Sequence, residues 1–179
     1  NSSIGDAERQ IGEYCASLIE DGSTIQAGIG KLPNAVLDAL SDKKDLGVHS
    51  ELFTTKMMEL AERGIINASK KTLHKGINVA TVLEGTKELY DWAHDNPSVQ
   101  LFPVEYVNDP GIISKNDKLV SINSCIEVDL FGQVAAESFG YKQATGAGGQ
   151  VDFVRGATMS KDGKSIIVIN STAARGTVS

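Results

Sequence analysis

Apolar residues first recur at helical spacing between positions 11 and 19. The five that fall on one face, at i, i+3, i+4, i+7 and i+8, are Ile11, Tyr14, Cys15, Leu18 and Ile19. This pattern predicts an amphipathic helix with a buried apolar face. The helix is expected to end at "EDG" (20–22), because Gly22 suits a C-terminal cap.

Short apolar runs then alternate with helical patterns. Strands are predicted at 23–30, 45–50, 77–85 and 99–107, and helices at 32–42, 55–64 and 86–97. Pro33 fits the first turn of its helix, and Gly64 and Pro97 are helix stops. Strands that alternate with helices are typical of an open, mostly parallel α/β sheet with helices on both faces.

The last third of the chain has a different pattern. Residues 118–138 predict two or three short strands with a turn near Phe131 and Gly132. Residues 146–157 predict a glycine loop that opens a short helix, and residues 164–172 predict a final buried strand. We expect these strands to extend the sheet, some of them by antiparallel pairing.

Composition narrows the class of protein. The chain has 179 residues, 41% of them hydrophobic and 22% charged, so one globular domain with a sizeable core is expected. No apolar run is long enough to span a membrane, and the first residues lack the layout of a secretory signal. The net charge of −6 argues against a nucleic-acid-binding protein, which normally carries a basic face. We therefore expect a cytoplasmic protein without nucleic-acid or membrane partners.

The cysteines and histidines show no metal-binding pattern. Cys15 and Cys125 lack C-x-x-C spacing and are predicted to be buried thiols of a reducing compartment. The three histidines are far apart in sequence, without the spacing of metal ligands: His49, His74 and His94. No metal site is expected.

Two glycine-rich loops are candidates for ligand binding. In "QAGIGKLP" (26–33), Gly28 and Gly30 precede a helix, so backbone N–H groups there could hold a phosphate or an oxyanion. The segment is not a dinucleotide fingerprint, because Pro33 stands where a third glycine belongs. A tight turn that needs glycine dihedral angles is an equally good explanation.

The second loop is "GAGGQVDF" (146–153). Gly146, Gly148 and Gly149 indicate either unusual backbone angles or the close approach of another group. Such loops are often plain turns, and Asp152 would suit the first turn of the following helix. Two glycine loops in one α/β domain favour a functional role slightly.

A carboxylate follows the second predicted strand, in "VHSE" (48–51). Open α/β sheets bind ligands at the carboxyl ends of their strands, which puts Glu51 at the rim of the expected site. Glu51 is a solvated loop acid, a charge at a helix start, or a nucleophile in a dry pocket. Gln26, His49 and Ser50 are suited to orient it. Asn123, between apolar residues, either satisfies a turn or positions another side chain.

Three spaced segments together resemble one family. The segments "GIGKLPNAVLDALSDKKDLGVHSELF" (28–53), "INSCIEVDLFGQVAAES" (122–138) and "GAGGQVDFVRGA" (146–157) resemble the C-terminal half of the acetyl-CoA hydrolase/transferase family. The 4-hydroxybutyrate CoA-transferases are the most similar subgroup. The resemblance implies that residues 1–179 are the C-terminal catalytic domain of a two-domain CoA-transferase. The N-terminal domain and the extreme C-terminus would then be absent.

The resemblance also implies a mechanism and site residues. Glu51 matches the catalytic glutamate, whose carboxylate attacks an acyl-CoA and then carries coenzyme A as a thioester, with ping-pong kinetics. Gln26, Gly28 and Gly30 match candidates for the oxyanion site, and Asn123 is expected to orient Glu51. Contacts with substrate or coenzyme A are assigned to His49, Gly146, Gly148 and Gly149.

The implied partners are an acyl-CoA and a short-chain carboxylic acid: 4-hydroxybutyrate, butyrate or acetate. Coenzyme A thioester is then a substrate, and no permanently bound cofactor is expected. A homo-oligomer is implied through the full-length protein. Alternatives are an acyl-CoA hydrolase, an inert isolated domain with a binding role, and a sugar-phosphate isomerase on a related fold.

The chain departs from the family at one point. The catalytic motif is commonly followed by an Asp-Gly pair, whereas this chain has Thr55 and Lys56. Lys56 either adds positive charge near the site or faces solvent. The departure leaves the identity of the acid open more than the chemistry.

Overall fold

A four-stranded parallel sheet forms the centre of the molecule, a computed structural model in which residues 4–173 and 177–178 are described. In spatial order its strands are β12 (Lys164–Val168), β7 (Leu119–Ser124), β1 (Thr24–Ala27) and β2 (Gly47–Val48). Every neighbouring pair is parallel. The predicted open, mostly parallel α/β sheet is therefore confirmed.

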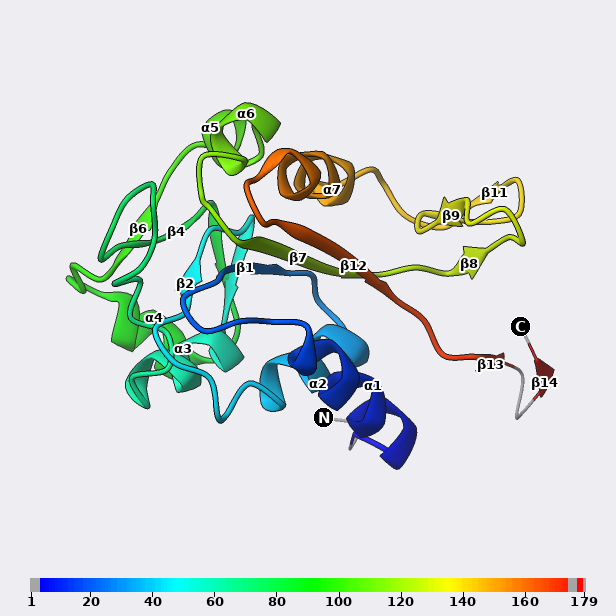
Figure 1. The fold of residues 1–179 in the computed structure, drawn as a ribbon, viewed down its shortest axis with the longest axis horizontal. Helices are drawn as coiled ribbons and strands as arrows, with labels where there is room; N and C mark the ends of the chain where they lie inside the picture. Colours follow the sequence, from blue (N-terminus) through cyan, green and yellow to red (C-terminus); the bar gives the residue numbers. More distant parts are fainter. Residues whose placement is uncertain (1–3, 174–176, 179) are drawn as a thin grey trace.

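Helices cover both faces of this sheet (Figure 1). The helices α1 (Asp6–Ser17) and α2 (Lys31–Asp38) lie on one face, and α7 (Gln150–Met159) lies on the other. All four residues of β1 are buried, as expected for a strand with helices on both sides. The main core packs around Ile25, Val48 and Ile122, and a smaller core beneath α7 contains Phe153.

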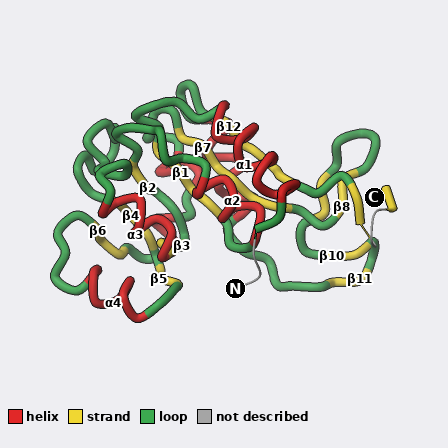
Figure 2. Tube along the Cα trace, turned by 90° about the horizontal axis from the view of Figure 1, so that it is seen from below, coloured by secondary structure: helices red, strands yellow, loops and turns green. Residues whose placement is uncertain are grey.

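The predicted strand 77–85 is two strands that belong to different pairs. β4 (Asn78–Ala80) pairs with β6 (Val99–Leu101), and β5 (Val82–Glu84) pairs with β3 (Leu52–Thr54), all in parallel. The break falls at Thr81, where two successive N–H groups, of Thr81 and Val82, donate to the Glu51 carbonyl. Figure 2 shows these short pairs beside α3 (Thr55–Glu62) and α4 (Lys87–Ala93).

The predicted strand 99–107 is also too long. It is extended only through Leu101, and two short helices follow, α5 (Val104–Val107) and α6 (Pro110–Ile113). Pro103 precedes the first of them as its N-cap, and Pro110 starts the second, where a missing N–H group costs nothing. Proline therefore starts the two helices here, which the apolar pattern did not reveal.

The buried face of α1 differs from the predicted one. Cys15 and Ile19 are buried, but Tyr14 is 70% exposed and Leu18 is 51% exposed. The buried helical face includes Gly12, whose hydrogen lies against the Ala35 backbone of α2 with no room for a side chain. A glycine contact between two helices therefore sets the rotation of α1.

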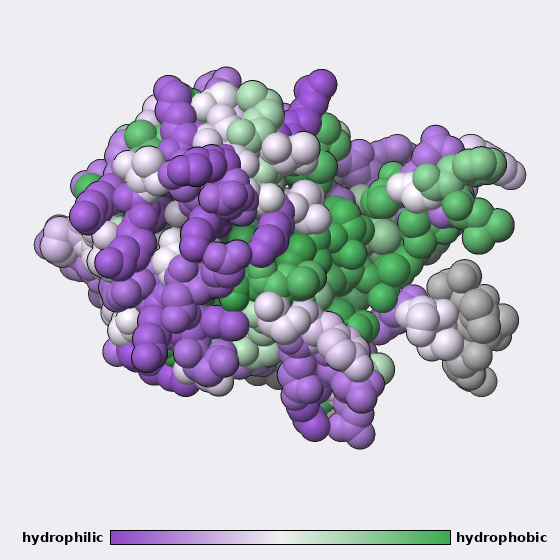
Figure 3. Space-filling view, viewed as in Figure 1, coloured by the Kyte–Doolittle hydropathy of each residue, from purple (hydrophilic) through white to green (hydrophobic). Residues whose placement is uncertain are grey.

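The segment that follows β7 leaves the body of the molecule as an arm (residues 127–143; Figure 1, right). The arm consists of two antiparallel hairpins, β8 (Glu127–Val128) with β9 (Val134–Ala135), and β10 (Ser138–Phe139) with β11 (Lys142–Gln143). The turn predicted near Phe131 and Gly132 is confirmed, but these strands do not extend the central sheet. Figure 3 shows apolar surface on the arm and on the adjoining body, and the exposed side chains include Leu130, Phe131 and Tyr141.

The final segment is shorter than predicted as a strand. β12 ends at Val168, and Thr172 belongs to β13 (Thr172–Ala173), which pairs with β14 (Thr177–Val178). Among residues 4–173 and 177–178, every helix is too short or too polar to span a bilayer. Cys15 is a buried free thiol, whereas Cys125 is a partly exposed free thiol, so the prediction of two buried thiols is half right.

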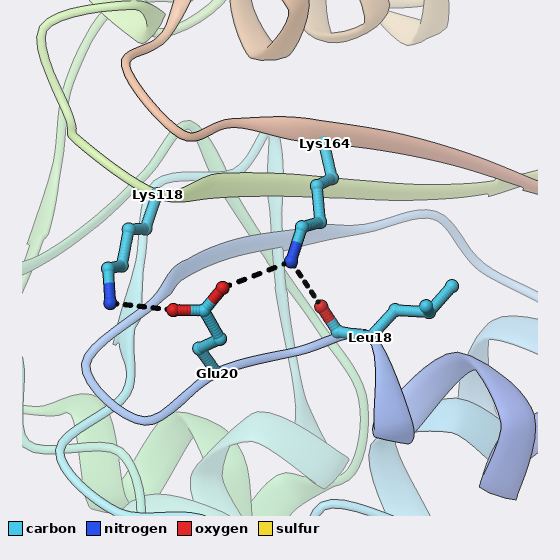
Figure 4. Close-up of polar contacts among 4 residues, drawn as sticks. All are labelled: Leu18, Glu20, Lys118 and Lys164. Atoms are coloured by element: carbon cyan, nitrogen blue, oxygen red, sulfur yellow. Dashed lines mark hydrogen bonds and ion pairs between the residues drawn. The ribbon is translucent and has the colours of Figure 1, made fainter.

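A group of ion pairs ties the opposite, amino-terminal edge of the sheet together (Figure 4). The Glu20 carboxylate accepts from Lys118 Nζ at 2.8 Å and from Lys164 Nζ at 3.2 Å, and Lys164 also donates to the Leu18 carbonyl. The hydrogen bond from Lys118 is the main cause that lowers the pKa of Glu20. These groups are solvent-exposed and contribute little to stability because water and salt screen them.

Candidate active site

Glu51 lies at the carboxyl edge of the sheet, between β2 and β3. Its backbone is fixed there, because the Glu51 carbonyl accepts from Thr81 N and Val82 N at 3.0 Å each. The side chain is partly buried in a crevice of about 420 Å³. The crevice is also lined by residues from β1, β7 and both glycine loops, among them Gln26, Gly28, Ser50, Asn123, Gly146, Gly148 and Gly149.

Two donors from separate elements hold one oxygen of the Glu51 carboxylate. Oε2 accepts from Asn108 Nδ2 at 2.9 Å and from the Gly149 N–H at 3.0 Å. Asn108 directly follows α5, and Gly149 is the N-cap of α7, whose positive end favours a nearby anion. Oε1 makes no hydrogen bond to any residue that the structure describes. The carboxylate is thus oriented through one oxygen and open at the other.

Gly149 permits this contact by its lack of a side chain. A Cβ atom at that position would collide with Glu51 Oε2 and with Asn108 Nδ2. The backbone itself has φ −78° and ψ 1°, which any L residue can adopt. Close approach, and not unusual backbone angles, therefore explains this glycine. Added Cβ atoms at Gly146 and Gly148 would meet nothing within 4 Å.

Gln26 and Asn123 bond to each other across β1 and β7. Gln26 Nε2 donates to Asn123 Oδ1 and Asn123 Nδ2 donates to Gln26 Oε1, both at 3.0 Å. The two amides form part of the crevice wall. Asn123 does not hydrogen-bond Glu51, so the expected orientation of the carboxylate by Asn123 does not occur through direct contact, which Asn108 makes instead.

The backbone donors expected in the first glycine loop are placed differently. The Gly28 N–H donates to the Ile122 carbonyl at 2.8 Å and so continues the sheet, which removes it as an oxyanion donor. Gly30, with φ +117°, is the N-cap of α2 and lines a neighbouring crevice with Thr54 and Lys56. The Gly28 N–H is therefore engaged in the sheet, and Gly30 lines the neighbouring crevice and not the one that contains Glu51.

Lys56 stands beside two carboxylates. Its Nζ lies 2.9 Å from Asp38 and 3.1 Å from Glu59. The hydrogen bond to Asp38 is the main cause that raises the pKa of Lys56. Its positive charge is therefore balanced locally instead of being directed at Glu51.

His49 lies beneath the crevice and does not line it. The side chain is fully buried, and Nε2 is 2.9 Å from the Val107 carbonyl. Burial lowers the pKa of His49 to about 4, so the ring is neutral at neutral pH. A carbonyl oxygen only accepts, so Nε2 carries the proton.

Lys71 is a second buried basic residue, and it lies against β2, the strand that leads to Glu51. Its Nζ donates to the carbonyls of Val48 and Ile77 at 2.8 Å each. Burial lowers the pKa of Lys71 to about 7. The lysine ties the strand that leads to Glu51 to the start of β4.

The buried Lys71 makes stability depend on pH. Between pH 7 and about 10 the unfolded chain holds more protons at this residue than the folded chain, so the free energy of unfolding rises with pH there. The slope is at most about 1.4 kcal/mol per pH unit. Below pH 7 both states are protonated and the contribution is constant. Lys71→Met is expected to remove this rise, measured by denaturant unfolding at pH 7, 8 and 9.

The exposed neighbour Lys70 provides the control for this prediction. Lys70→Met should leave the pH profile of the unfolding free energy parallel to that of the unchanged protein. A parallel profile for Lys71→Met as well would contradict a depressed pKa at Lys71.

Sequence reasoning missed Asn108 and Lys71. Asn108 could have been found, because it follows the fourth predicted strand (99–107) in "EYVNDP" and so returns to the carboxyl edge of the sheet. Lys71 carries no such signal, since a lysine in "KKTLHKG" is ordinarily exposed. No group of three or more His, Cys, Asp or Glu residues suited to a metal ion occurs in residues 4–173 and 177–178.

Comparison with known proteins gives consistent matches. The model of the acetyl-CoA hydrolase/transferase C-terminal domain matches residues 85–179. A 4-hydroxybutyrate coenzyme A transferase of Clostridium kluyveri is 59% identical over 98% of this chain, which corresponds to 41% of that protein.

Solved structures agree with this match. A 4-hydroxybutyrate CoA-transferase from Porphyromonas gingivalis superimposes with a TM-score of 0.87 at 50% identity, over 98% of this chain and 42% of that one. RipA from Yersinia pestis superimposes with a TM-score of 0.93 at 44% identity, over 100% of this chain and 40% of that one. The chain therefore spans about two fifths of the length of the proteins that it resembles.

Proposed function

The chain belongs to the acetyl-CoA hydrolase/transferase family, and from this premise we propose that it carries the nucleophile of a CoA-transferase. In this proposal Glu51 moves coenzyme A from an acyl-CoA to a short-chain carboxylic acid. The observation that carries the proposal is the state of the Glu51 carboxylate. One oxygen is held by Asn108 and Gly149, and the other faces a crevice at the carboxyl edge of the sheet.

The proposed reaction is a double displacement. Glu51 Oε1 attacks the acyl-CoA carbonyl, and the CoA thiolate leaves to give an acyl-glutamyl anhydride. The thiolate then attacks the glutamyl carbonyl, which releases the first carboxylate and leaves a thioester on Glu51. The second acid reverses these two steps, so it departs as a new acyl-CoA and Glu51 is regenerated. Carboxylate exchanges for carboxylate, so no ATP is required.

The two hydrogen bonds on Oε2 suggest how the glutamyl steps are accelerated. When Oε1 forms the anhydride, Oε2 becomes the carbonyl oxygen of the glutamyl group. Each attack of a thiolate or a carboxylate on that carbonyl puts negative charge on Oε2. Asn108 Nδ2 at 2.9 Å and Gly149 N at 3.0 Å are at the distance of oxyanion donors. We assign the oxyanion site of the glutamyl intermediates to these two groups.

The proposed acids are 4-hydroxybutyrate, butyrate and acetate, and the proposed CoA donor is an acyl-CoA of the same size. Support comes from the relatives named 4-hydroxybutyrate CoA-transferase, at 59% and 50% identity. Coenzyme A enters as a substrate. Assembly into homo-oligomers stays a prediction.

Domain organisation is part of the same proposal. Because the chain spans 41% of its Clostridium kluyveri relative, we propose that it is the C-terminal catalytic domain of a two-domain enzyme. The 179 residues alone are then expected to turn over butyryl-CoA and acetate far more slowly than the full-length enzyme. Equal turnover numbers would contradict this division of labour.

The mechanism is tested by trapping the intermediate. The full-length enzyme is incubated with butyryl-CoA in the absence of an acceptor acid and is then treated with hydroxylamine. Peptide mass mapping is expected to place a hydroxamate on Glu51. A label on another carboxylate would refute the assignment. Release of free coenzyme A at the same rate with and without acetate would indicate a hydrolase instead.

Asn108→Ala is expected to slow transfer by about 10²-fold, because removal of one oxyanion donor typically costs 10²–10³ in rate. Asn123→Ala is the matched comparison, since this amide lines the same crevice but bonds to Gln26. Its effect on kcat should be clearly smaller. Steady-state kcat for butyryl-CoA and acetate gives both values, and a larger loss for Asn123→Ala would contradict the role of Asn108.

A further inference from the structure

His49 contacts both elements that hold the Glu51 carboxylate. Its Nε2–H donates to the carbonyl of Val107, the residue before Asn108. Its ring packs against Phe153 of α7, with ring centroids 6.3 Å apart and an angle of 59° between the planes. Val107 and Phe153 are themselves buried in the same core cluster. The imidazole therefore bridges the Asn108 segment and the first turns of α7.

The contact with Val107 reaches Asn108 through a rigid unit. The Val107 carbonyl and the Asn108 nitrogen belong to one planar peptide group, so a hydrogen bond on this carbonyl fixes the plane that leads into Asn108. The Asn108 N–H also donates to the Val104 carbonyl at 2.9 Å, which holds the other side of the same plane. With this plane fixed, the Asn108 Cα is held at the position from which its side chain reaches Glu51 Oε2.

The contact with Phe153 reaches Gly149 through one helical turn. The Phe153 N–H donates to the Gly149 carbonyl at 3.0 Å, so the two residues are joined in the first turn of α7. Phe153 is 1% exposed, and its ring lies tilted against that of His49. A shift of that ring would move the Gly149 N–H, the second donor on Glu51 Oε2.

The surroundings of His49 exclude direct roles in the reaction. The side chain has no exposed surface and is separated from the crevice, so it cannot touch a substrate. Burial keeps the ring neutral, and its proton is on Nε2, bonded to Val107. Nδ1 has no partner among the residues that the structure describes.

We propose that His49 is a positioning residue, which holds the Val107 peptide and the Phe153 ring so that Asn108 and Gly149 meet on Oε2 of Glu51. This inference rests on the proposed function of Glu51 as the nucleophile. It assigns the histidine of "VHSE" to the alignment of the oxyanion donors, not to contact with coenzyme A.

The test compares three substitutions in the full-length enzyme. His49→Gln keeps an N–H donor near the position of Nε2, His49→Asn places its amide near Nδ1 instead, and His49→Phe keeps the ring but no nitrogen. His49→Asn and His49→Phe are expected to lower kcat by about 10–100-fold, because a displacement of about 1 Å can cost 10²-fold. KM for butyryl-CoA should change by less than about two-fold, and His49→Gln should restore kcat to within about three-fold.

A second measurement tests whether His49 acts through Asn108. In the Asn108→Ala background, His49→Phe, which keeps a ring against Phe153 and loses only the hydrogen bond to Val107, is expected to lower kcat by less than about three-fold, since residues that act as a unit are not additive. A full additional loss in that background would overturn the inference. So would a selective rise in KM, or a loss that His49→Gln does not relieve.

Glu51→Gln, assayed alongside, separates this inference from the proposed function. If Glu51→Gln retains activity, the proposed function itself is wrong. If Glu51→Gln is inactive while His49→Asn and His49→Phe both keep the unchanged kcat, only the role of His49 is overturned.

Discussion

Glu51→Gln is expected to abolish CoA transfer, with a loss of kcat of about 10⁴–10⁶-fold, as for other enzymes that lose their nucleophile. A carboxamide is too weak a nucleophile to form the anhydride, and it is not a competent leaving group in the reverse step. The fold should be unaffected, because the glutamine Oε1 can still accept from Asn108 and Gly149. Transfer from butyryl-CoA to acetate measures kcat, and mass spectrometry of the intact enzyme detects the covalent intermediate.

Glu62→Gln is the control for this substitution. Glu62 is an exposed residue of α3 on the same stretch of chain, and it lies outside the crevice. Its replacement should leave kcat and the melting temperature unchanged. Activity of Glu51→Gln within ten-fold of Glu62→Gln would overturn the nucleophilic role of Glu51, particularly if a covalent CoA adduct still formed.

The location of Glu51 was predictable from sequence because it depends on topology alone. Buried strands near 23–30 and 45–50 were evident as apolar runs, and a parallel arrangement brings their carboxyl ends to one edge. The partners of Glu51 were not predictable in this way. Asn108 and Gly149 are 57 and 98 residues away in sequence, and their distance from Glu51 depends on how α5 and α7 pack.

The errors in the fold prediction share one physical cause. Apolar periodicity reports which positions are buried, and it does not report which backbone groups are paired. The run 77–85 is mostly apolar, yet it breaks at Thr81 because the Glu51 carbonyl takes two successive N–H groups. Tyr14 fits the helical pattern but is exposed, since the contact at Gly12 sets the rotation of α1. Both features arise from tertiary contacts.

The same tertiary contacts make the site sensitive to small changes in volume. Glu51, Asn108 and Gly149 meet at a single oxygen, and each comes from a different part of the chain. An added methyl group at this point would displace the ends of two side chains, the Glu51 carboxylate and the Asn108 amide, and so break the hydrogen bonds that align them. The expected consequence is a loss of alignment without a loss of folding.

Gly149→Ala is accordingly expected to lower kcat by about 10²–10³-fold while the melting temperature stays within a few degrees. The new Cβ would collide with Glu51 Oε2 and Asn108 Nδ2, so the carboxylate must rotate away from both donors. The backbone angles at this N-cap position suit alanine, which leaves α7 intact. Steady-state kinetics with butyryl-CoA and acetate, together with a thermal melt, separates the two effects.

Gly148→Ala is the matched control for this prediction, because it adds the same methyl group to the adjacent residue of the same loop. Its Cβ would meet nothing within 4 Å. Both substitutions lower the conformational entropy of the unfolded chain by the same amount, so this effect on stability cancels when the two variants are compared. Gly148→Ala should keep kcat within a few-fold of the unchanged enzyme. Equal losses in the two variants would mean that the flexibility of the loop or its contact with substrate, and not the close approach of Gly149 to Glu51, limits the reaction.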